Sequence, residues 1–236
     1  MTEDPNVENP QLFAVAVDGP SGAGKSTTAR GVALELGWNY LDTGAMYRAM
    51  TWWMLQHDVD THDPDAVSQH ALTPELIVST DPHGPGVLID GSDVTDEIRD
   101  PRVTDAVSAV SAVPAVRERL VELQRAAIAE GPVVIEGRDI GTIVAPDAPV
   151  KVFLVASSDA RAERRNAELD GRHRASLEDT LTSLNRRDLL DSQREVSPLM
   201  RADDAIEIDT TDQSLDDVIK HVVELVRQRL SSVATS

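Results

Sequence analysis

The feature that most constrains this chain is a glycine-rich segment near its beginning, in which a lysine and a serine follow the last glycine. It runs from Gly19 to Ser26 and fits the pattern G-x-x-x-x-G-K-[ST]. An apolar run of strand length, residues 12–17, precedes it, and a helical pattern over residues 25–36 follows and stops at Gly37. Strand, loop and helix in this order turn backbone N–H groups toward an anion at the helix N-terminus. The segment therefore predicts a phosphate-binding loop.

The chemistry of phosphoryl transfer assigns roles to the residues of this loop. We expect Lys25 to bridge the β- and γ-phosphates of ATP, and the Ser26 hydroxyl to ligate the Mg2+ that accompanies the nucleotide. A GTPase switch would also need a guanine-reading Asn-Lys-x-Asp stretch, which is absent because the three lysines stand at positions 25, 151 and 220. The motif predicts nucleotide binding and leaves a motor or chaperone ATPase open beside a kinase. The predicted ATP-binding residues are Gly19, Pro20, Ser21, Gly22, Ala23, Gly24, Lys25, Ser26 and Thr27.

Short apolar segments alternate with helical patterns along the rest of the chain. Such alternation is typical of a parallel sheet covered by helices on both faces. We therefore predict an α/β fold of three layers, built on the phosphate-binding loop, with a mostly five-stranded parallel sheet. Strands are expected at residues 12–17, 38–41, 132–135, 150–155 and 205–208, and helices at 25–36, 44–56, 103–113, 114–129, 158–169, 176–190 and 214–230.

One segment interrupts the alternation. Between residues 59 and 97 Pro, Asp, Gly and His recur, and residues 76–80 and 86–90 are typical of antiparallel strands joined by a Pro-His-Gly-Pro turn. This pattern predicts an inserted subdomain with a small antiparallel sheet of its own. The predicted organisation is a flexible tail over 1–11, a core over 12–58 and 130–236, an insert over 59–129, and a mobile lid over 161–175 within the core.

Composition narrows the classes of partner. The chain has no cysteine, which excludes disulfides, thiolate metal sites and cysteine catalysis. Its formal net charge of -19 disfavours nucleic acid and anionic membranes as partners. No apolar stretch is long enough to span a bilayer, and the first residues do not have the pattern of a signal peptide. We expect a cytoplasmic protein, and a monomer because no exposed apolar heptad is visible.

Arginines gather at places that a phosphate enzyme needs. Arg48 and Arg138 lie in segments that follow the second and third predicted core strands, and strand C-termini border the ligand crevice of an open parallel sheet. Arg161 and Arg165 lie on a later helix, where a lid could bring them over the phosphates, although solvated helix arginines are common. A guanidinium group can bind two phosphate oxygens at once through two parallel hydrogen bonds. The pattern therefore favours transfer to a phosphorylated acceptor.

Taken together, these motifs resemble the bacterial cytidylate (CMP/dCMP) kinase family over about residues 12–230. The order of the Tyr-Arg, Ile-Arg and Gly-Arg-Asp elements, with a long insert between the second and third core strands, is more specific than the phosphate-binding loop alone. The residues that carry the resemblance are Asp18–Lys25, Leu41–Arg48, Val94–Arg99, Val103–Arg117, Glu136–Thr142, Pro146–Pro149 and Arg187–Pro198.

The resemblance implies an ATP:CMP phosphotransferase whose insert binds the nucleoside monophosphate. It implies Lys25, Arg138, Arg161 and Arg165 as catalytic residues and Mg2+ as the cofactor. It also implies three groups on the acceptor side: Thr43, Arg48 and Arg138 for the CMP phosphate; Ser108, Arg117 and Asp139 for cytosine; and Arg187, Asp191 and Arg194 for the ribose. A carboxylate suits the N4 amine of cytosine, and a guanidinium suits its O2 and N3 acceptors.

Two positions depart from the family pattern, and three other interpretations stay open. Glu136 stands where the family often has aspartate, and Thr43 replaces a serine while keeping its hydroxyl. The alternatives are a P-loop kinase for another small acceptor, such as AMP, shikimate or dephospho-CoA, a nucleotide-binding regulator, and a structural domain. The arginines on the acceptor side argue against the last two, because neither needs them.

Overall fold

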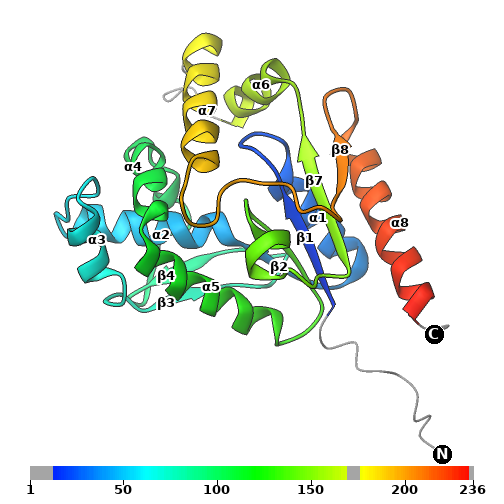
Figure 1. Cartoon of the computed structure of the whole chain (residues 1–236), viewed down its shortest axis with the longest axis horizontal. Helices are drawn as coiled ribbons and strands as arrows, with labels where there is room; N and C mark the ends of the chain where they lie inside the picture. The colour runs from blue at the N-terminus through cyan, green and yellow to red at the C-terminus, as the bar shows by residue number, and fades with distance from the viewer. Residues whose placement is uncertain (1–12, 169–175, 234–236) are drawn as a thin grey trace, which may run out of the picture.

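The computed structural model describes residues 13–168 and 176–233. Five parallel strands form the central sheet in the order β2-β6-β1-β7-β8, and three short strands form a separate antiparallel sheet in the order β3-β4-β5 (Figure 1). The α/β class, the five-stranded parallel sheet and the small antiparallel sheet are confirmed. Among the described residues, no helix is both long and apolar enough to cross a membrane. The predicted tail and residues 169–175 of the predicted lid lie outside the described residues.

The first half of the chain builds the phosphate-binding loop and most of the insert. The elements in order are β1 (Ala14–Asp18), α1 (Lys25–Leu36), β2 (Asn39–Asp42), α2 (Thr43–Gln56), α3 (Pro64–His70), β3 (Leu76–Val78), β4 (Val87–Ile89), β5 (Ser92–Asp93), a 3-10 turn (Glu97–Arg99), α4 (Pro101–Ala112) and α5 (Pro114–Ile128). Helix α4 begins earlier than predicted because Asp100 accepts a hydrogen bond from the Arg102 N–H and Pro101 occupies the first turn.

The second half returns to the sheet. It contains β6 (Val133–Glu136), a π-helical turn (Ile140–Val144), β7 (Val150–Val155), α6 (Ser158–Glu168), α7 (Leu177–Ser192), β8 (Ile206–Asp209) and α8 (Leu215–Val233). Helices α6 and α7 lie beyond the end of the sheet to which the parallel strands point, and the loop after β1 lies at the same end (Figure 1). The C-terminal ends of the strands therefore bring the predicted site residues together.

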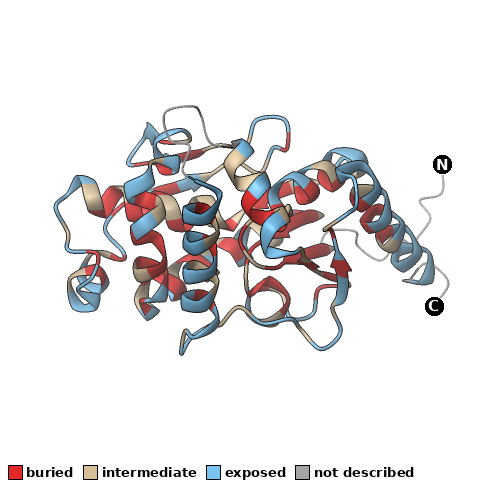
Figure 2. Ribbon diagram, turned by 90° about the horizontal axis from the view of Figure 1, so that it is seen from above, coloured by how far each residue is buried: buried red, intermediate tan, exposed pale blue. Residues whose placement is uncertain are grey.

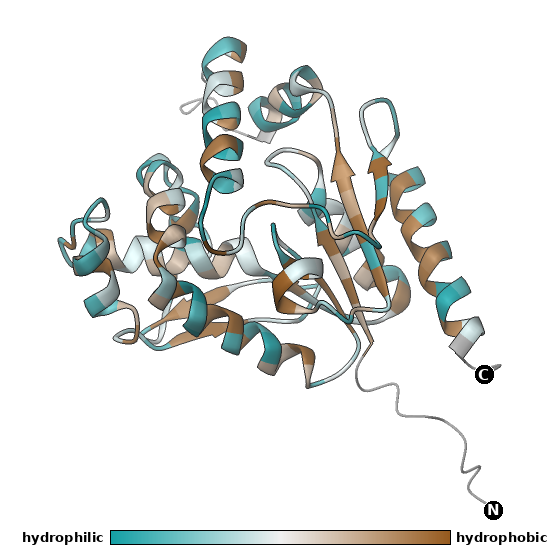
Figure 3. Cartoon of the chain, in the orientation of Figure 1, coloured by the Kyte–Doolittle hydropathy of each residue, from teal (hydrophilic) through white to brown (hydrophobic). Residues whose placement is uncertain are grey.

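Side-chain alternation along β1 explains why both faces of the sheet are covered. All five residues of β1 are buried. Ala14 and Ala16 pack in an apolar cluster with α2, α4 and α5, whereas Val15 and Val17 pack in a second cluster with α1 and α8. Buried residues, red in Figure 2, lie mainly in the interior between the helices and the sheet. The apolar stripes of α5 and α8 are brown in Figure 3.

The insert shares its apolar core with one face of the central sheet. Val67, Ile89 and Val107 belong to the same buried cluster as Leu41 of β2 and Ile135 of β6. Helix α2 connects the two parts, because it packs on α4 and β4 and also reaches β6. Hydrophobic burial therefore stabilises the segment predicted to be an insert together with the sheet.

Candidate functional site

Glycine backbone geometry shapes the phosphate-binding loop between β1 and α1. Gly22 and Gly24 have φ angles of 78° and 87°, in the left-handed region that favours glycine. A Cβ atom at Gly19 would overlap the carbonyl oxygen of Leu154 in β7. Helix α1 starts at Lys25 directly after Gly24. The loop therefore takes a path that larger residues at these positions would disturb, and it presents the N-terminus of α1 to the crevice.

Lys25 is buried at the first position of α1, and it forms no ion pair within residues 13–168 and 176–233. Its Nζ donates a hydrogen bond of 2.8 Å to the Pro20 carbonyl oxygen. Burial and the nearby charge of Arg138 lower the pKa of Lys25 to about 7, while Glu136 opposes the shift. A bound phosphate would reverse the balance, because an opposite charge favours the protonated amine.

Glu136 at the end of β6 is the acidic partner of the loop. It accepts a 2.7 Å hydrogen bond from the Tyr40 hydroxyl. Burial and the charge of Asp42 raise the pKa of Glu136 to about 7, while Lys25 and a hydrogen bond with Ser26 lower it. The neighbouring Ser26 hydroxyl and Glu136 carboxyl offer the oxygen ligands that Mg2+ prefers. No cluster of three or more His, Cys, Asp or Glu that could hold a metal by itself occurs in the described part of the chain.

Arginines meet on the acceptor side of the crevice. Arg48 Nη1 donates to the Ile98 carbonyl at 3.2 Å and to Thr104 Oγ1 at 2.9 Å, and no ion pair of Arg48 occurs among the described residues. Burial and the charge of Arg165 lower its pKa to about 10. Burial and the charge of Arg48 lower the pKa of Arg187 to about 9, with Arg138 adding to the effect. Each positively charged guanidinium group destabilises the charge of the others, and a bound anion would offset this repulsion.

Helix α7 supplies a carboxylate that orders part of this arginine group. Asp191 Oδ2 accepts from Arg138 Nε at 3.0 Å, and Asp191 Oδ1 pairs with Arg194 at 3.0 Å. Burial raises the pKa of Asp191, but Arg138, Arg194 and Arg187 outweigh burial, so the net pKa lies below its usual value. The residues predicted to hold the ribose therefore lie beside those predicted to hold the phosphate.

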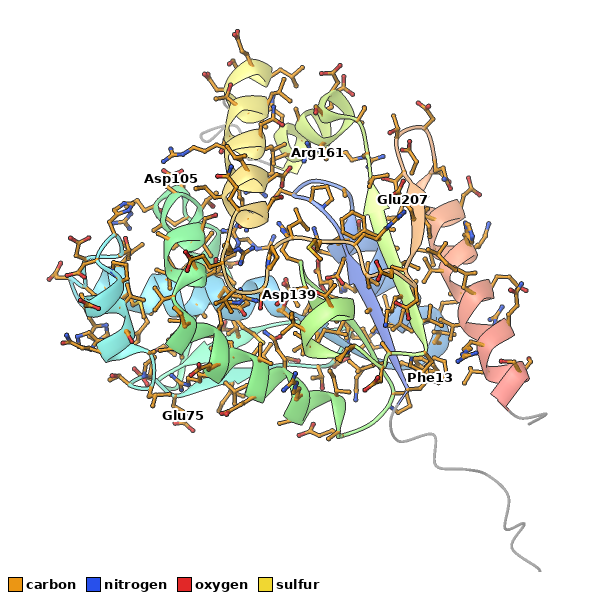
Figure 4. The ribbon with its side chains drawn as sticks, in the orientation of Figure 1. Phe13, Glu75, Asp105, Asp139, Arg161 and Glu207 are labelled. Carbon is orange, nitrogen blue, oxygen red and sulfur yellow. The ribbon has the colours of Figure 1, made fainter. Side chains whose placement is uncertain are left out.

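The predicted base-reading residues form a buried pair. Arg117 of α5 and Asp139, which follows β6, make an ion pair whose side chains are 2% and 6% exposed. Arg117 also donates to the Ser111 carbonyl at 3.2 Å and lies 5.2 Å from the centre of the Tyr47 ring. Ser108 is buried on the neighbouring α4. Asp139 lies near the middle of the molecule in Figure 4.

Thr43 and two helix arginines have other partners. Thr43 Oγ1 donates to the Glu136 carbonyl at 2.6 Å, so it lies at the strand end beside the arginine group. Arg161 of α6, labelled in Figure 4, is buried against the loop, where Nη1 donates to the Ser21 carbonyl at 3.0 Å and pairs with Asp188. Arg165 lies close enough to Arg48 to affect its pKa. The structure thus brings Arg165 toward the acceptor side and commits Arg161 to the loop itself.

Sequence reasoning missed two residues of the site. Tyr40 holds Glu136, and Asp188 contacts both the loop and Arg161. Tyr40 lies in an expected strand, and the only sequence feature that marks Asp188 is its place beside Arg187. A cavity of about 320 Å3, lined by residues such as Ala14, Arg125 and Val144, lies near the first residue of β1, away from this chemistry.

The parallel sheet and the loop between β1 and α1 define a P-loop nucleotide-binding protein. A family model described as cytidylate kinase matches residues 15–228. The cytidylate kinase of Streptomyces avermitilis is 54% identical over 217 residues, which cover 91% of this chain and 93% of that protein. The cytidylate kinase of Mycobacterium avium is 51% identical and covers 91% of this chain and 95% of its own length. The chain therefore belongs to the cytidylate kinase family.

A solved structure also shares the fold at low identity. An uncharacterized protein from Eubacterium ventriosum gives a TM-score of 0.50 at 13% identity and covers 92% of this chain and 99% of its own. At this identity the likeness shows the fold alone.

Proposed function

We propose that this enzyme transfers the γ-phosphoryl group of ATP to CMP or dCMP, giving ADP and CDP or dCDP. The observation that carries the proposal is the juxtaposition of a phosphate-binding loop with a group of arginines that repel one another, Arg48, Arg138 and Arg187. Relatives that cover most of the chain are named cytidylate kinases, which supports CMP as the acceptor.

ATP is proposed to bind with its β- and γ-phosphates at the Gly19–Thr27 loop, where Lys25 supplies a cation. Mg2+, when bound beside Ser26 and Glu136, would neutralise charge on the phosphate oxygens. Arg48 and Arg138 hold the CMP phosphate with Thr43. The acceptor needs no general base, because its phosphate is largely ionised at neutral pH. What this chain contributes is positioning and charge stabilisation.

Base selection is assigned to the buried pair of Arg117 and Asp139, with Ser108 beside it. The ion pair holds each side chain in one orientation. Asp139 accepts from the N4 amine of cytosine, and Arg117 donates to its ring acceptors. Uracil presents an acceptor, O4, to the carboxylate, which would leave polar groups unpaired. The site should therefore reject UMP.

Arg187, Asp191 and Arg194 are proposed to hold the ribose, and Arg165 to approach the transferring phosphoryl group. A catalytic role for Arg161 requires it to leave its contacts with Ser21 and Asp188, so it stays a prediction. Four further features are also predictions: the lid over residues 161–175, the boundaries of the insert that binds the monophosphate, a monomeric state and a cytoplasmic location.

The test compares ADP release from Mg-ATP with CMP, dCMP, UMP, AMP, shikimate, dephospho-CoA or no acceptor. Stimulation by CMP and dCMP, but little by UMP or AMP, is expected. Stimulation by AMP, shikimate or dephospho-CoA instead would favour another small-acceptor kinase, and slow turnover unaffected by any acceptor would favour a regulator.

The loop assignment has its own control. Lys25→Ala should abolish turnover because it removes the cation from the β- and γ-phosphates. Lys220→Ala changes an exposed lysine on α8 and should keep full activity. Near-normal turnover of Lys25→Ala would refute the role of the loop.

A further inference from the structure

Ser21, in the middle of the phosphate-binding loop, is held on both sides of its backbone. Its N–H donates a 3.0 Å hydrogen bond to Asp188 Oδ1. Its carbonyl oxygen accepts a 3.0 Å hydrogen bond from Arg161 Nη1, and the same Nη1 pairs with Asp188 Oδ2. Asp188 and Arg161 thus close a ring of contacts around one residue of the loop. We call these three residues the Ser21 clamp.

The Ser21 clamp is joined to the acceptor side through a second carboxylate on the same helix. Arg138 donates from Nη2 to the Ser21 hydroxyl at 2.8 Å and from Nε to Asp191 Oδ2 at 3.0 Å. Asp188 and Asp191 are three residues apart on α7, so they share a face of the helix. One helix therefore holds one loop residue twice, directly through Asp188 and indirectly through Asp191 and Arg138.

Burial distinguishes the Ser21 clamp from an ordinary surface ion pair. The side chains of Arg161 and Asp188 are only 8% and 16% exposed. Gly22, the next loop residue, packs against Arg161 so closely that an added Cβ would lie 3.1 Å from the Arg161 Cβ. Movement of Arg161 or Asp188 would therefore move the backbone that has to surround the phosphates.

Anchoring the loop does not by itself explain why a charged carboxylate, Asp188, lies beside a site for anions. A lone carboxylate at an anion-binding loop would repel ATP, so its presence needs compensation. Arg161 provides that compensation, and the pair together adds no net charge. Because α7 also carries Arg187 and Asp191, any adjustment of this helix to the acceptor reaches the ATP loop through the Ser21 clamp.

We propose that Asp188 is a positioning residue that couples acceptor binding on α7 to the conformation of the ATP loop, so that each substrate binds more tightly when the other is present. The inference rests on the proposed function, because it takes CMP as the acceptor. Linkage requires the coupling to be reciprocal: CMP tightens ATP binding by the same factor by which ATP tightens CMP binding. Loss of the carboxylate separates the two sites without removing a group that touches either substrate.

The test measures the Kd of a non-hydrolysable ATP analogue by calorimetry, with and without saturating CMP, for the wild type, Asp188→Asn and Glu178→Gln. Asn keeps the size of the side chain and removes its charge. Glu178 is an exposed acid on the same helix and serves as the matched control. The wild type and the control should bind the analogue several-fold more tightly with CMP. In Asp188→Asn this ratio should approach one.

Kinetics give a second readout that a purely structural role would not move in the same way. A loop misplaced relative to the acceptor should lower kcat of Asp188→Asn by about 10- to 100-fold. The KM for CMP, measured at saturating ATP, should change by a smaller factor than kcat. If melting curves show that Asp188→Asn is unfolded at the assay temperature, Asp188→Glu replaces it. Glu keeps the charge but displaces the carboxylate by one methylene, so the binding ratio should again fall.

The outcomes separate this inference from the proposed function. A wild type that lacks CMP-stimulated turnover would overturn the proposed function. A wild type with normal turnover whose two ligands bind independently would overturn the coupling. So would a folded Asp188→Asn or Asp188→Glu variant that retains the wild-type ratio.

Discussion

Removing one partner of the buried pair formed by Arg117 and Asp139 should destabilise the fold strongly, and removing both should restore much of the loss. The single variants are Asp139→Ala and Arg117→Met, and the third protein carries both changes. Each single variant leaves the other charge with almost no access to water, since the two side chains are 2% and 6% exposed. An unpaired charge in such surroundings is costly.

The expected magnitude follows from the remaining contacts. Breaking a buried ion pair by deleting one partner typically costs about 3–5 kcal/mol. After Asp139→Ala, Arg117 keeps the Ser111 carbonyl and the face of Tyr47, so we expect a loss near 3 kcal/mol at the lower end of that range. The double variant has no uncompensated charge, and its loss should fall short of the sum of the single losses by about 2 kcal/mol or more.

Urea titrations of the four proteins at pH 7, followed by tryptophan fluorescence, measure these free energies of unfolding. The double variant also separates stability from selectivity. It should fold well enough to be assayed, yet lose discrimination between CMP and UMP, because neither base-reading group remains. A loss below about 1 kcal/mol in both single variants, as for an exposed pair, would refute the reasoning.

Two further predictions concern other charges of the site. Burial raises the pKa of Asp18 from 3.8 to about 6; because the folded carboxyl then holds its proton more tightly than the unfolded one, this contribution to stability is full below about pH 4 and is lost as the pH rises through 6. The free energy of unfolding of the wild type minus that of Asp18→Asn should therefore fall by up to about 3 kcal/mol between pH 4 and 7.5 in urea titrations, and a constant or rising difference would contradict this. Inorganic phosphate should raise the melting temperature of the wild type more than that of Arg48→Met, with about 1.4 kcal/mol expected at ten times its Kd. The exposed Arg102→Met is the control, and equal increases in Arg48→Met and the wild type would argue against an anion site at Arg48.

The local patterns of the sequence predicted the parts of the fold that depend on local chemistry. The strand before Gly19, the helix from Lys25 to Leu36 and the strands of the five-stranded sheet have clear apolar periods and turn residues, and the structure contains them. Helix α3 was not predicted, although Asp63 and Pro64 are typical of a helix start, because its seven residues are too few to show a periodic apolar pattern.

The parts that sequence did not predict depend on contacts across the chain. The π-helical turn at Ile140–Val144 forms where the Asp18 carboxylate accepts the N–H groups of Ile140 and Gly141, at 2.9 and 2.8 Å. The Ser21 contact with Asp188 joins residues separated by 167 positions. Helical spacing placed Arg161 on a helix but could not tell whether its face meets the phosphates or the underside of the loop. Such pairings follow from tertiary packing, and contacts between distant residues leave no periodic pattern in a single sequence.

The net charge of -19 and the arginine group of the site act over different ranges. Charges on the outer surface are screened within about 8 Å at physiological ionic strength, whereas partly buried charges are screened much less. Burial is the main cause of the lowered pKa values of Arg48 and Arg187. The charges of neighbouring arginines, Arg165 for Arg48 and Arg48 for Arg187, add a smaller repulsion. Asp191 relieves part of it by pairing with Arg138 and Arg194 without covering Arg48. The repulsion that remains costs stability in the free enzyme, and a bound phosphate would relieve it, so the same arginines that weaken the empty fold create its affinity for anions.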